Sequence, residues 1–357
     1  MCGKLRALKK FFILLAALGF ATLGAELTPA ALIGGRSYVS LADWARVNGF
    51  GAFSRNGGTE FVLTNKTSRL IFEKDSADAS INDVNVRLSF PIAKGGFISQ
   101  LDVDKTVRPL VFTQKSAAKK VTTICLDPGH GGKDSGNRVG GLFFGHSEKN
   151  YTLALAQELR DQLTRAGFNV ILTRSKDAFV DLPARPALAN QRGADLFVSL
   201  HFNATQTGRN EVAGPETYCI TPVGAASSNA QGEGSGWGAT TANLSENKSL
   251  LLAYQMQRSL TQNLHAPDRG VRRARFAVLR DAAMPAILIE GGYMTNPTEG
   301  KKIFDAAYRK QMAAATVKGI LAYQRLTAPP PVATTAERPL IRKRAPLTSR
   351  TGTTKNQ

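Results

Sequence analysis

Cysteine, acidic side chains and long apolar runs are what this 357-residue sequence has little of. It has three cysteines and no CxxC pair, which excludes a cysteine-rich structural zinc site. Cys125 and Cys219 lie in apolar, strand-like runs, where a cysteine behaves as a small hydrophobic residue. We therefore expect two buried thiols, and a disulfide between them is the alternative for an exported chain.

The scarcity of acidic residues leaves the chain strongly basic. Lysine and arginine total 46 against 27 acidic residues, which gives a formal charge of +19. Partners of such a surface are polyanions: envelope polymers, lipid headgroups or nucleic acid. No nucleic-acid partner is predicted, because the aromatic residues do not alternate with a basic stripe in any known module. A general gain in solubility is the alternative explanation of the charge.

Residues 1–25 have the pattern of a secretory signal peptide. Four cations precede the apolar run 11–20, and the small residues Gly24 and Ala25 mark a cleavage site. A membrane anchor is the alternative, but the run is shorter than the roughly 20 residues that cross a bilayer. No later run has that length, so we expect an exported protein of the periplasm or cell envelope, with no transmembrane helix after cleavage.

Residues 26–115 are predicted to form a small, strand-rich α+β domain. Val84, Val86, Leu88 and Phe90 alternate with polar residues, and short β-favouring runs are separated by turn formers. Segments 38–43 and 97–102 also resemble each other, which indicates either two equivalent strand-to-helix corners or chance. The polar segment 113–120 suits a linker.

Residues 116–327 are predicted to form an α/β domain, with a mostly parallel sheet flanked by helices on both faces. The pattern alternates apolar strands with long amphipathic helices. The expected strands are 121–126, 169–173, 195–200, 217–220, 277–279 and 286–289, and the expected helices are 150–166, 185–192, 249–264 and 306–326. Residues 223–243 are predicted to form a surface loop, and 328–357 a basic disordered tail.

Residues capable of binding a metal stand where these elements begin or end. His130 and His201 each follow or close a strand, and Glu148 begins a helix. Two imidazoles and one carboxylate, with a fourth position left for water, are a ligand set that Zn²⁺ prefers. Each residue has a simpler explanation: a hydrogen-bonded histidine at a strand end, or a carboxylate favoured by a helix N-terminus. The convergence of all three is what predicts a zinc site.

Glu290 follows the apolar run 285–289 directly, and a carboxylate in that place needs a partner or a cation. Asp127 and Asn203, which adjoin the two histidine motifs, are candidates for orienting the metal ligands.

Residues 120–326 resemble the zinc N-acetylmuramoyl-L-alanine amidases of the type-3 amidase family. Several motifs in one order carry the resemblance: 127–132 (Asp-Pro-Gly-His-Gly-Gly), Glu148-Lys149, 199–203 (Ser-Leu-His-Phe-Asn), 269–271 (Arg-Gly-Val) and 289–293 (Ile-Glu-Gly-Gly-Tyr). The resemblance implies that His130, Glu148 and His201 bind zinc and that Glu290 is the catalytic glutamate. Tyr293 stands where the family usually has phenylalanine. Residues 26–115 diffusely resemble the module named after the amino-terminal domain of copper amine oxidases.

The implied reaction is hydrolysis, by a zinc-activated water, of the peptidoglycan amide between the lactyl group of N-acetylmuramic acid and L-alanine, in wall remodelling or daughter-cell separation. Peptidoglycan is the expected partner, and an activator or septal protein is left open. Some relatives carry an inhibitory helix after the second histidine; the glycine-rich 223–243 indicates that this chain lacks it. A zinc peptidase of the stem peptide and a non-catalytic wall-binding protein remain the alternatives.

Overall fold

The computed structural model describes residues 31–112, 120–140, 145–228 and 238–328. The predicted signal peptide, most of the linker, part of the 223–243 loop and nearly all of the basic tail lie outside the described residues, as does the proposed domain boundary near residue 115. Within the described ranges, no helix is both long and apolar enough to cross a membrane.

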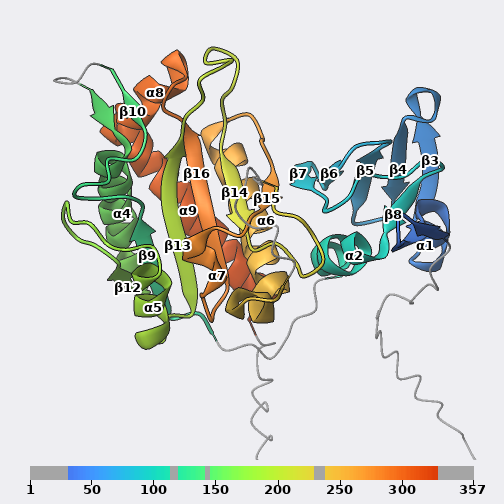
Figure 1. Cartoon of the computed structure of the whole chain (residues 1–357), viewed down its shortest axis with the longest axis horizontal. Helices are drawn as coiled ribbons and strands as arrows, with labels where there is room; N and C mark the ends of the chain where they lie inside the picture. The colour runs from blue at the N-terminus through green and yellow to red at the C-terminus, as the bar shows by residue number, and fades with distance from the viewer. Residues whose placement is uncertain (1–30, 113–119, 141–144, 229–237, 329–357) are drawn as a thin grey trace, which may run out of the picture.

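The amino-terminal part is a run of short strands with three short helices and two helical turns (Figure 1). Its elements are β1 (Ala31–Ile33), β2 (Arg36–Ser40), α1 (Leu41–Val47), β3 (Gly51–Arg55), η1 (Asn56–Gly58), β4 (Glu60–Thr64), β5 (Arg69–Glu73), β6 (Asp78–Ile81), β7 (Val84–Arg87), β8 (Phe97–Ser99), α2 (Gln100–Asp102), η2 (Val103–Val107) and α3 (Arg108–Val111).

The two similar segments of this part are equivalent strand-to-helix corners, as one of the two readings of the sequence proposed. β2 leads into α1 and β8 leads into α2, and β2 and β8 pair antiparallel. Ser40 and Ser99 are the respective N-caps, and each hydroxyl accepts a hydrogen bond from the backbone N–H three residues on. The shared sequence therefore reflects shared capping chemistry.

The carboxyl-terminal part alternates strands and helices as predicted. Its elements are β9 (Thr123–Pro128), β10 (Arg138–Val139), β11 (His146–Ser147), α4 (Glu148–Arg165), β12 (Asn169–Leu172), α5 (Ala184–Gln191), β13 (Leu196–Asn203), β14 (Glu216–Cys219), η3 (Thr241–Ser245), α6 (Glu246–Leu264), β15 (Val271–Arg273), α7 (Ala277–Arg280), β16 (Ala286–Tyr293), α8 (Pro297–Phe304) and α9 (Ala306–Thr327). The strand expected at 277–279 is wrong, since these residues form α7. A three-residue apolar run has no periodicity that separates helix from strand.

The main sheet has eleven strands in the order β12-β9-β13-β16-β14-β15-β7-β6-β5-β4-β3. β12, β9, β13 and β16 run parallel, β14 runs antiparallel to β16, and β15 is parallel to β14. A mostly parallel sheet in this part is thus confirmed. Unexpectedly, the sheet continues into the amino-terminal part, because β15 pairs with β7 through Val271 and Val86.

Helices cover both faces of the sheet in the carboxyl-terminal part, as expected. On one face, side chains such as Leu126 and Ile287 pack with residues of α4, α6 and α9. This core continues across the β15–β7 pair to Val86 and Phe72. On the other face, a smaller cluster joins β-strand residues to α5 and α7. Cys125 belongs to the second cluster and Cys219 to the first, and both are buried free thiols, which confirms that expectation.

Candidate active site

Three ligand-type side chains, from three elements, meet at the edge where β9 and β13 end. His130 lies in the loop after β9, Glu148 is the first residue of α4, and His201 lies near the end of β13. One ligand atom of each lies within 4.8 Å of the others. His130 Nε2 is 3.0 Å from Glu148 Oε2, and His201 Nδ1 is 3.0 Å from Glu148 Oε1. The predicted metal ligands are therefore brought together.

Two glycines make room for this approach. A Cβ at Gly129 would lie 2.3 Å from the His201 ring, and a Cβ at Gly136 would lie 2.5 Å from the His130 ring. His130 itself has a φ of 63°, in the left-handed region, and Arg185 Nη2 donates to its carbonyl over 2.9 Å. The glycines of this loop thus leave the space in which the two rings can face one carboxylate.

Glu148 is almost completely buried and is held as an anion. Its Oε1 accepts a hydrogen bond from the Phe202 backbone N–H and its Oε2 one from the Asn137 N–H. Burial by itself would raise the pKa of Glu148, but the hydrogen bonds and charges of His130 and His201 outweigh it and lower that pKa well below its usual range. A buried carboxylate of this kind requires a positive partner.

Asp134 orients one of the histidines, and the sequence analysis missed it. Its Oδ2 lies 2.8 Å from His130 Nδ1, on the side of the ring away from Glu148. Burial lowers the pKa of His130, while its contacts with Glu148 and Asp134 raise it, and the net change is upward. A carboxylate on one ring nitrogen fixes the tautomer and leaves the other nitrogen for a metal. The signal was a carboxylate four residues after the histidine, within the same glycine-rich loop.

The two residues expected to orient the ligands do so only indirectly or not at all. Asp127 is buried and accepts hydrogen bonds from Thr173, Ser199 and Arg185. It therefore acts on His130 through Arg185, which donates to the His130 carbonyl. The Asn203 side chain accepts a hydrogen bond from the next backbone N–H, and no contact with a ligand joins it to the site among the described residues.

Glu290 lies beside His201 on the neighbouring parallel strand β16, where the two residues are Cα partners. Its Oε2 atom is buried and has no hydrogen-bond partner in the described part of the chain. Burial raises the pKa of Glu290 well above its ordinary value, and the negative charges of Glu148 and Glu216 raise it further. The fourth predicted residue thus adjoins the other three, as a carboxyl group poised to hold a proton.

Glu216 has its pKa shifted in the opposite direction from that of Glu290. The sequence analysis did not identify this residue. It faces Glu290 across the antiparallel β14–β16 pair. Its oxygens contact Arg269 Nε at 2.9 Å and Arg272 Nε at 2.7 Å, and it accepts hydrogen bonds from the hydroxyls of Tyr218 and Tyr293. Burial would raise its pKa, but these contacts lower it. Its position before the apolar run 217–220 was the available signal.

Tyr293 stands where the family usually has phenylalanine, and its hydroxyl belongs to the cluster around Glu216. The hydroxyl donates to Glu216, and the ring lies under the Arg269 guanidinium at 5.1 Å. A phenylalanine would keep the ring contact and lose the hydrogen bond.

The segment that carries this site matches a known protein family. Residues 124–322 match the model of the Amidase_3 family, N-acetylmuramoyl-L-alanine amidase. The chain is 35% identical over 201 residues to the uncharacterized protein YqiI of Bacillus subtilis, covering 56% of this chain and 84% of that protein.

Two relatives carry the amidase name. The chain is 34% identical to the N-acetylmuramoyl-L-alanine amidase LytC of Bacillus subtilis, across 57% of this chain and 36% of LytC. It is 32% identical to the N-acetylmuramoyl-L-alanine amidase AmiA of Escherichia coli, across 59% of this chain and 78% of AmiA. Among solved structures, an N-acetylmuramoyl-L-alanine amidase from Clostridium difficile 630 is 32% identical, with a TM-score of 0.47 over 58% of this chain and 98% of that one. The family match covers more than half of the chain and includes every residue of the site, so this protein belongs to the N-acetylmuramoyl-L-alanine amidase family.

Proposed function

We propose that this protein is a zinc-dependent N-acetylmuramoyl-L-alanine amidase that cuts the amide between the muramyl lactyl group and L-alanine in peptidoglycan. The observation that carries the proposal is the convergence of His130, Glu148 and His201 beside Glu290, inside the segment that matches the amidase family. Its role would be wall remodelling or cell separation.

The residues present fit a zinc ion. Two imidazole nitrogens and one carboxylate oxygen face one point, and three protein ligands with an open fourth position are typical of catalytic zinc. The carboxylate is buried and ionised, and one imidazole is oriented by Asp134. When bound, Zn²⁺ would supply a Lewis acid that lowers the pKa of water towards about 7 and polarises the amide carbonyl.

Glu290 would move the protons. In its ionised form, a Glu290 with a raised pKa is a stronger base than an ordinary carboxylate, and its Oε2 has no hydrogen-bond partner among the described residues. It can therefore take a proton from the attacking water and, once protonated, deliver that proton to the departing amine. Burial and the negative charge of Glu148 would keep the pKa of Glu290 raised, and the charge of Glu216, directly across the strand pair, would add to them. Backbone N–H groups or arginines at the site would supplement the charge that stabilises the oxyanion.

Export to the periplasm or cell envelope is part of the proposal. It is supported by the leader pattern of residues 1–25 and by a relative from Staphylococcus epidermidis that is named as a probable cell wall amidase, LytH. The role of residues 26–115 as a wall-binding module of the type found ahead of other wall hydrolases also stays a proposal.

The deciding experiment is dye release from labelled peptidoglycan by the purified protein, with chelator and then zinc added back, followed by mass analysis of the fragments. We expect release that stops with chelator, returns with zinc, and yields peptides that begin with L-alanine. Cleavage within the stem peptide would instead establish the peptidase, and tight zinc without any release would favour the wall-binding protein.

Two histidine variants make the metal assignment specific. His201→Ala should abolish both zinc binding and release, because it removes one of three ligands. His265→Asn is the matched control: His265 is exposed at the end of α6 with a φ of 49°, which asparagine also adopts. Equal zinc content in wild type and His201→Ala would overturn the ligand set.

A further inference from the structure

The outer surfaces of α6 and α9 carry charge of one sign. α9 contains four lysine or arginine residues and no acidic residue. The only acidic residue of α6, Glu246, is buried in the first turn and forms an ion pair with Lys105. The exposed cations of the two helices therefore have no exposed acidic neighbour on their own helices, and such a surface attracts anions.

A groove of about 540 Å³ lies between α6 and α9, and we call it the helix groove. Its volume is within the range of ligand sites. Arg258 of α6 lines it together with Lys318 and Arg325 of α9, and no carboxylate is among the lining residues that the structure describes. Asp83 lies in an adjoining hollow, which Arg258 also lines, and is paired there with Arg69 at 3.5 Å. The three cations thus leave an excess of positive charge in the helix groove.

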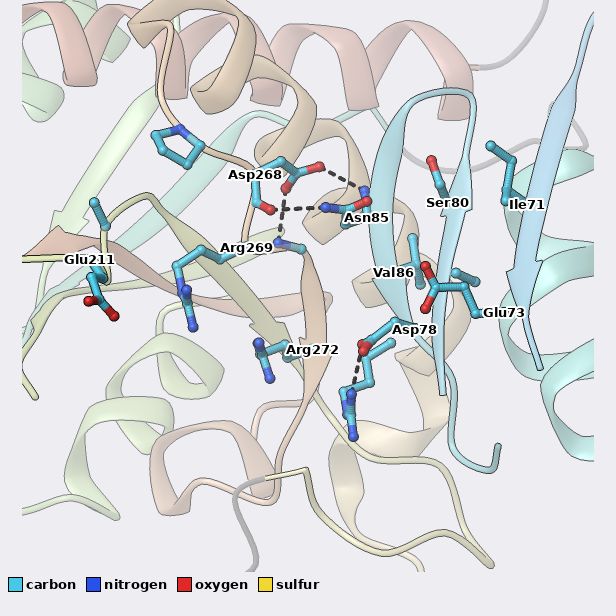
Figure 2. Close-up of a pocket in the computed structure, with 15 residues that line it drawn as sticks. Ile71, Glu73, Asp78, Ser80, Asn85, Val86, Glu211, Asp268, Arg269 and Arg272 are labelled. Carbon is cyan, nitrogen blue, oxygen red and sulfur yellow. Dashed lines mark hydrogen bonds and ion pairs between the residues drawn. The ribbon is translucent and has the colours of Figure 1, made fainter. Parts of the chain in front are cut away.

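Figure 2 shows a groove of the opposite kind, at the seam where β15 pairs with β7. Its cations have carboxylates of the chain beside them. Arg87 contacts Asp78 at 2.7 Å. Arg269 and Arg272 both contact Glu216. Acidic side chains of the protein therefore neutralise the cations at the seam, whereas no carboxylate among the described residues lines the helix groove.

One wall of the helix groove holds an amide that lacks a partner. Gln255 of α6 lines the groove with only 9% of its surface exposed, and its side chain forms no hydrogen bond with the described residues. Gln257, two residues on, is also buried, but its amide is bonded to Thr217, Pro215 and Asp268. Burial of an amide without a hydrogen bond is unfavourable. The Gln255 amide is therefore available to a ligand that enters the groove.

The helix groove is preformed, because hydrogen bonds tie α6 to the elements on both sides of it. The Ser259 hydroxyl donates to the Ala315 carbonyl of α9 over 2.7 Å. The Tyr254 hydroxyl donates to the Ile81 carbonyl of β6 over 2.7 Å. A ligand would therefore find the walls in place without rearrangement of the helices.

The chemistry of the helix groove suits a phosphate group that has carbon attached. Arginine and lysine side chains are common ligands of phosphate oxygens, and an amide N–H adds a neutral donor. Leu110 and Leu326 belong to the same lining, so apolar surface adjoins the cations. An anionic phospholipid offers both features, with charged oxygens for the cations and the first carbons of its acyl chains for the leucines.

The place of the helix groove in the fold favours a membrane as the source of the phosphate. Ile287 and Ile289 of β16 pack in one core with residues of α6 and α9. Alternate side chains of a strand point to opposite faces, so Glu290 points away from these helices. A membrane that contacts α6 and α9 would leave the face with Glu290 free for the wall. Beyond α9, residues 329–357 add six lysine or arginine residues and one glutamate, a composition that favours anionic lipid.

We propose that the helix groove binds the phosphate of an anionic phospholipid and so holds the protein on a membrane surface. Arg258, Lys318 and Arg325 contact the phosphate oxygens. The Gln255 amide donates to the headgroup. The inference goes beyond the proposed reaction and uses no residue of the candidate active site; only the choice of a membrane rests on the proposed export.

The test is co-sedimentation of the purified protein with vesicles of phosphatidylcholine alone and of an equal mixture of phosphatidylcholine and phosphatidylglycerol. We expect binding to the mixed vesicles only. Arg258→Gln and Arg325→Gln should each weaken it about fivefold, and Gln255→Met about threefold, because the last change removes a hydrogen bond and no charge. Lys310→Gln is the control and should bind as the wild type does: Lys310 is an exposed cation of α9 that does not line the helix groove.

Equal losses in the control and in the groove variants would overturn the proposal, since total charge would then account for the binding. Calorimetry with inorganic phosphate distinguishes the sources of phosphate. Groove-dependent binding of the free ion, with unchanged binding to vesicles, would overturn the lipid assignment. Groove-dependent binding to a phosphate-rich wall polymer and not to vesicles would overturn it as well. His201→Ala should bind vesicles as the wild type does, so the result can be interpreted even if the protein hydrolyses nothing.

Discussion

The two halves of the eleven-stranded sheet differ in strand direction, and that difference decides where the chemistry lies. β9, β13 and β16 run parallel, so their carboxyl ends meet at one edge and bring His130, His201 and Glu290 together. From β7 to β3 every neighbouring pair is antiparallel, so strand ends alternate and polar side chains spread along a face. The parallel half builds a converging site, and the antiparallel half offers a surface.

The same contrast appears at closer range between Glu290 and Glu216. They face each other on β16 and β14, yet one has a raised pKa and a buried oxygen without a partner, and the other has a lowered pKa and two arginines. Two carboxylates placed in this way take different roles, one holding a proton and one holding charge.

The largest effect that would sharpen this contrast is on activity. Glu290→Gln should reduce kcat by about 10²–10⁴-fold, because an amide cannot transfer the proton. Zinc content, measured by atomic absorption, should stay as in the wild type, since Glu290 is not among the converging ligands. Asp161→Asn, an exposed carboxylate-to-amide change on α4, is the control. Full activity in a zinc-loaded Glu290→Gln protein would show that the proton is carried elsewhere.

A smaller effect is expected on stability from Glu216→Gln. The change should lower the free energy of unfolding at neutral pH by about 2 kcal/mol, less than for a fully buried pair. The reason for the discount is that Arg269 and Arg272 keep 30% and 25% of their side chains exposed.

The pH dependence of this variant follows from the lowered pKa of Glu216. The ion pairs stabilise the fold above the unfolded-state pKa of a glutamate, near 4.5, and the stabilisation is lost as the pH falls through the lower folded-state value. Urea unfolding of both proteins should therefore show a stability difference that is constant above pH 5 and shrinks below about 4.5. A difference that stayed constant down to pH 3 would contradict the assignment.

The smallest effects concern the two capped corners of the amino-terminal part. Ser99→Ala should cost about 1.5 kcal/mol of unfolding free energy and Ser40→Ala about 0.5 kcal/mol. The buried Ser99 hydroxyl also donates to Asp102 at 2.7 Å, whereas the Ser40 hydroxyl makes one exposed hydrogen bond of 3.3 Å. Thermal unfolding of the two variants compares them directly, and equal losses would show that burial of the cap does not matter here.

Much of the fold could be read from periodicity. The long helices α4, α6 and α9 fall within a few residues of the predicted ranges, because their apolar faces repeat over many residues. The strands β9, β12, β13 and β14 also lie close to their predicted ranges. The segment 277–279 was assigned the wrong element, since three residues define no period. The partners of Asp127 were also misjudged, because hydrogen bonds to Thr173, Ser199 and Arg185 depend on elements far apart in the chain.

The sequence by itself determined the alternation of strands and helices, and with it the expectation that His130, His201 and Glu290 meet at the strand ends. These follow from local periodicity and from the rule that parallel strands end at one edge. Only the tertiary structure decided that the sheet continues from β15 into β7, that Glu216 faces Glu290, and that a groove opens at the seam. Register and the pairing of distant strands depend on packing across the whole core, which no local pattern encodes.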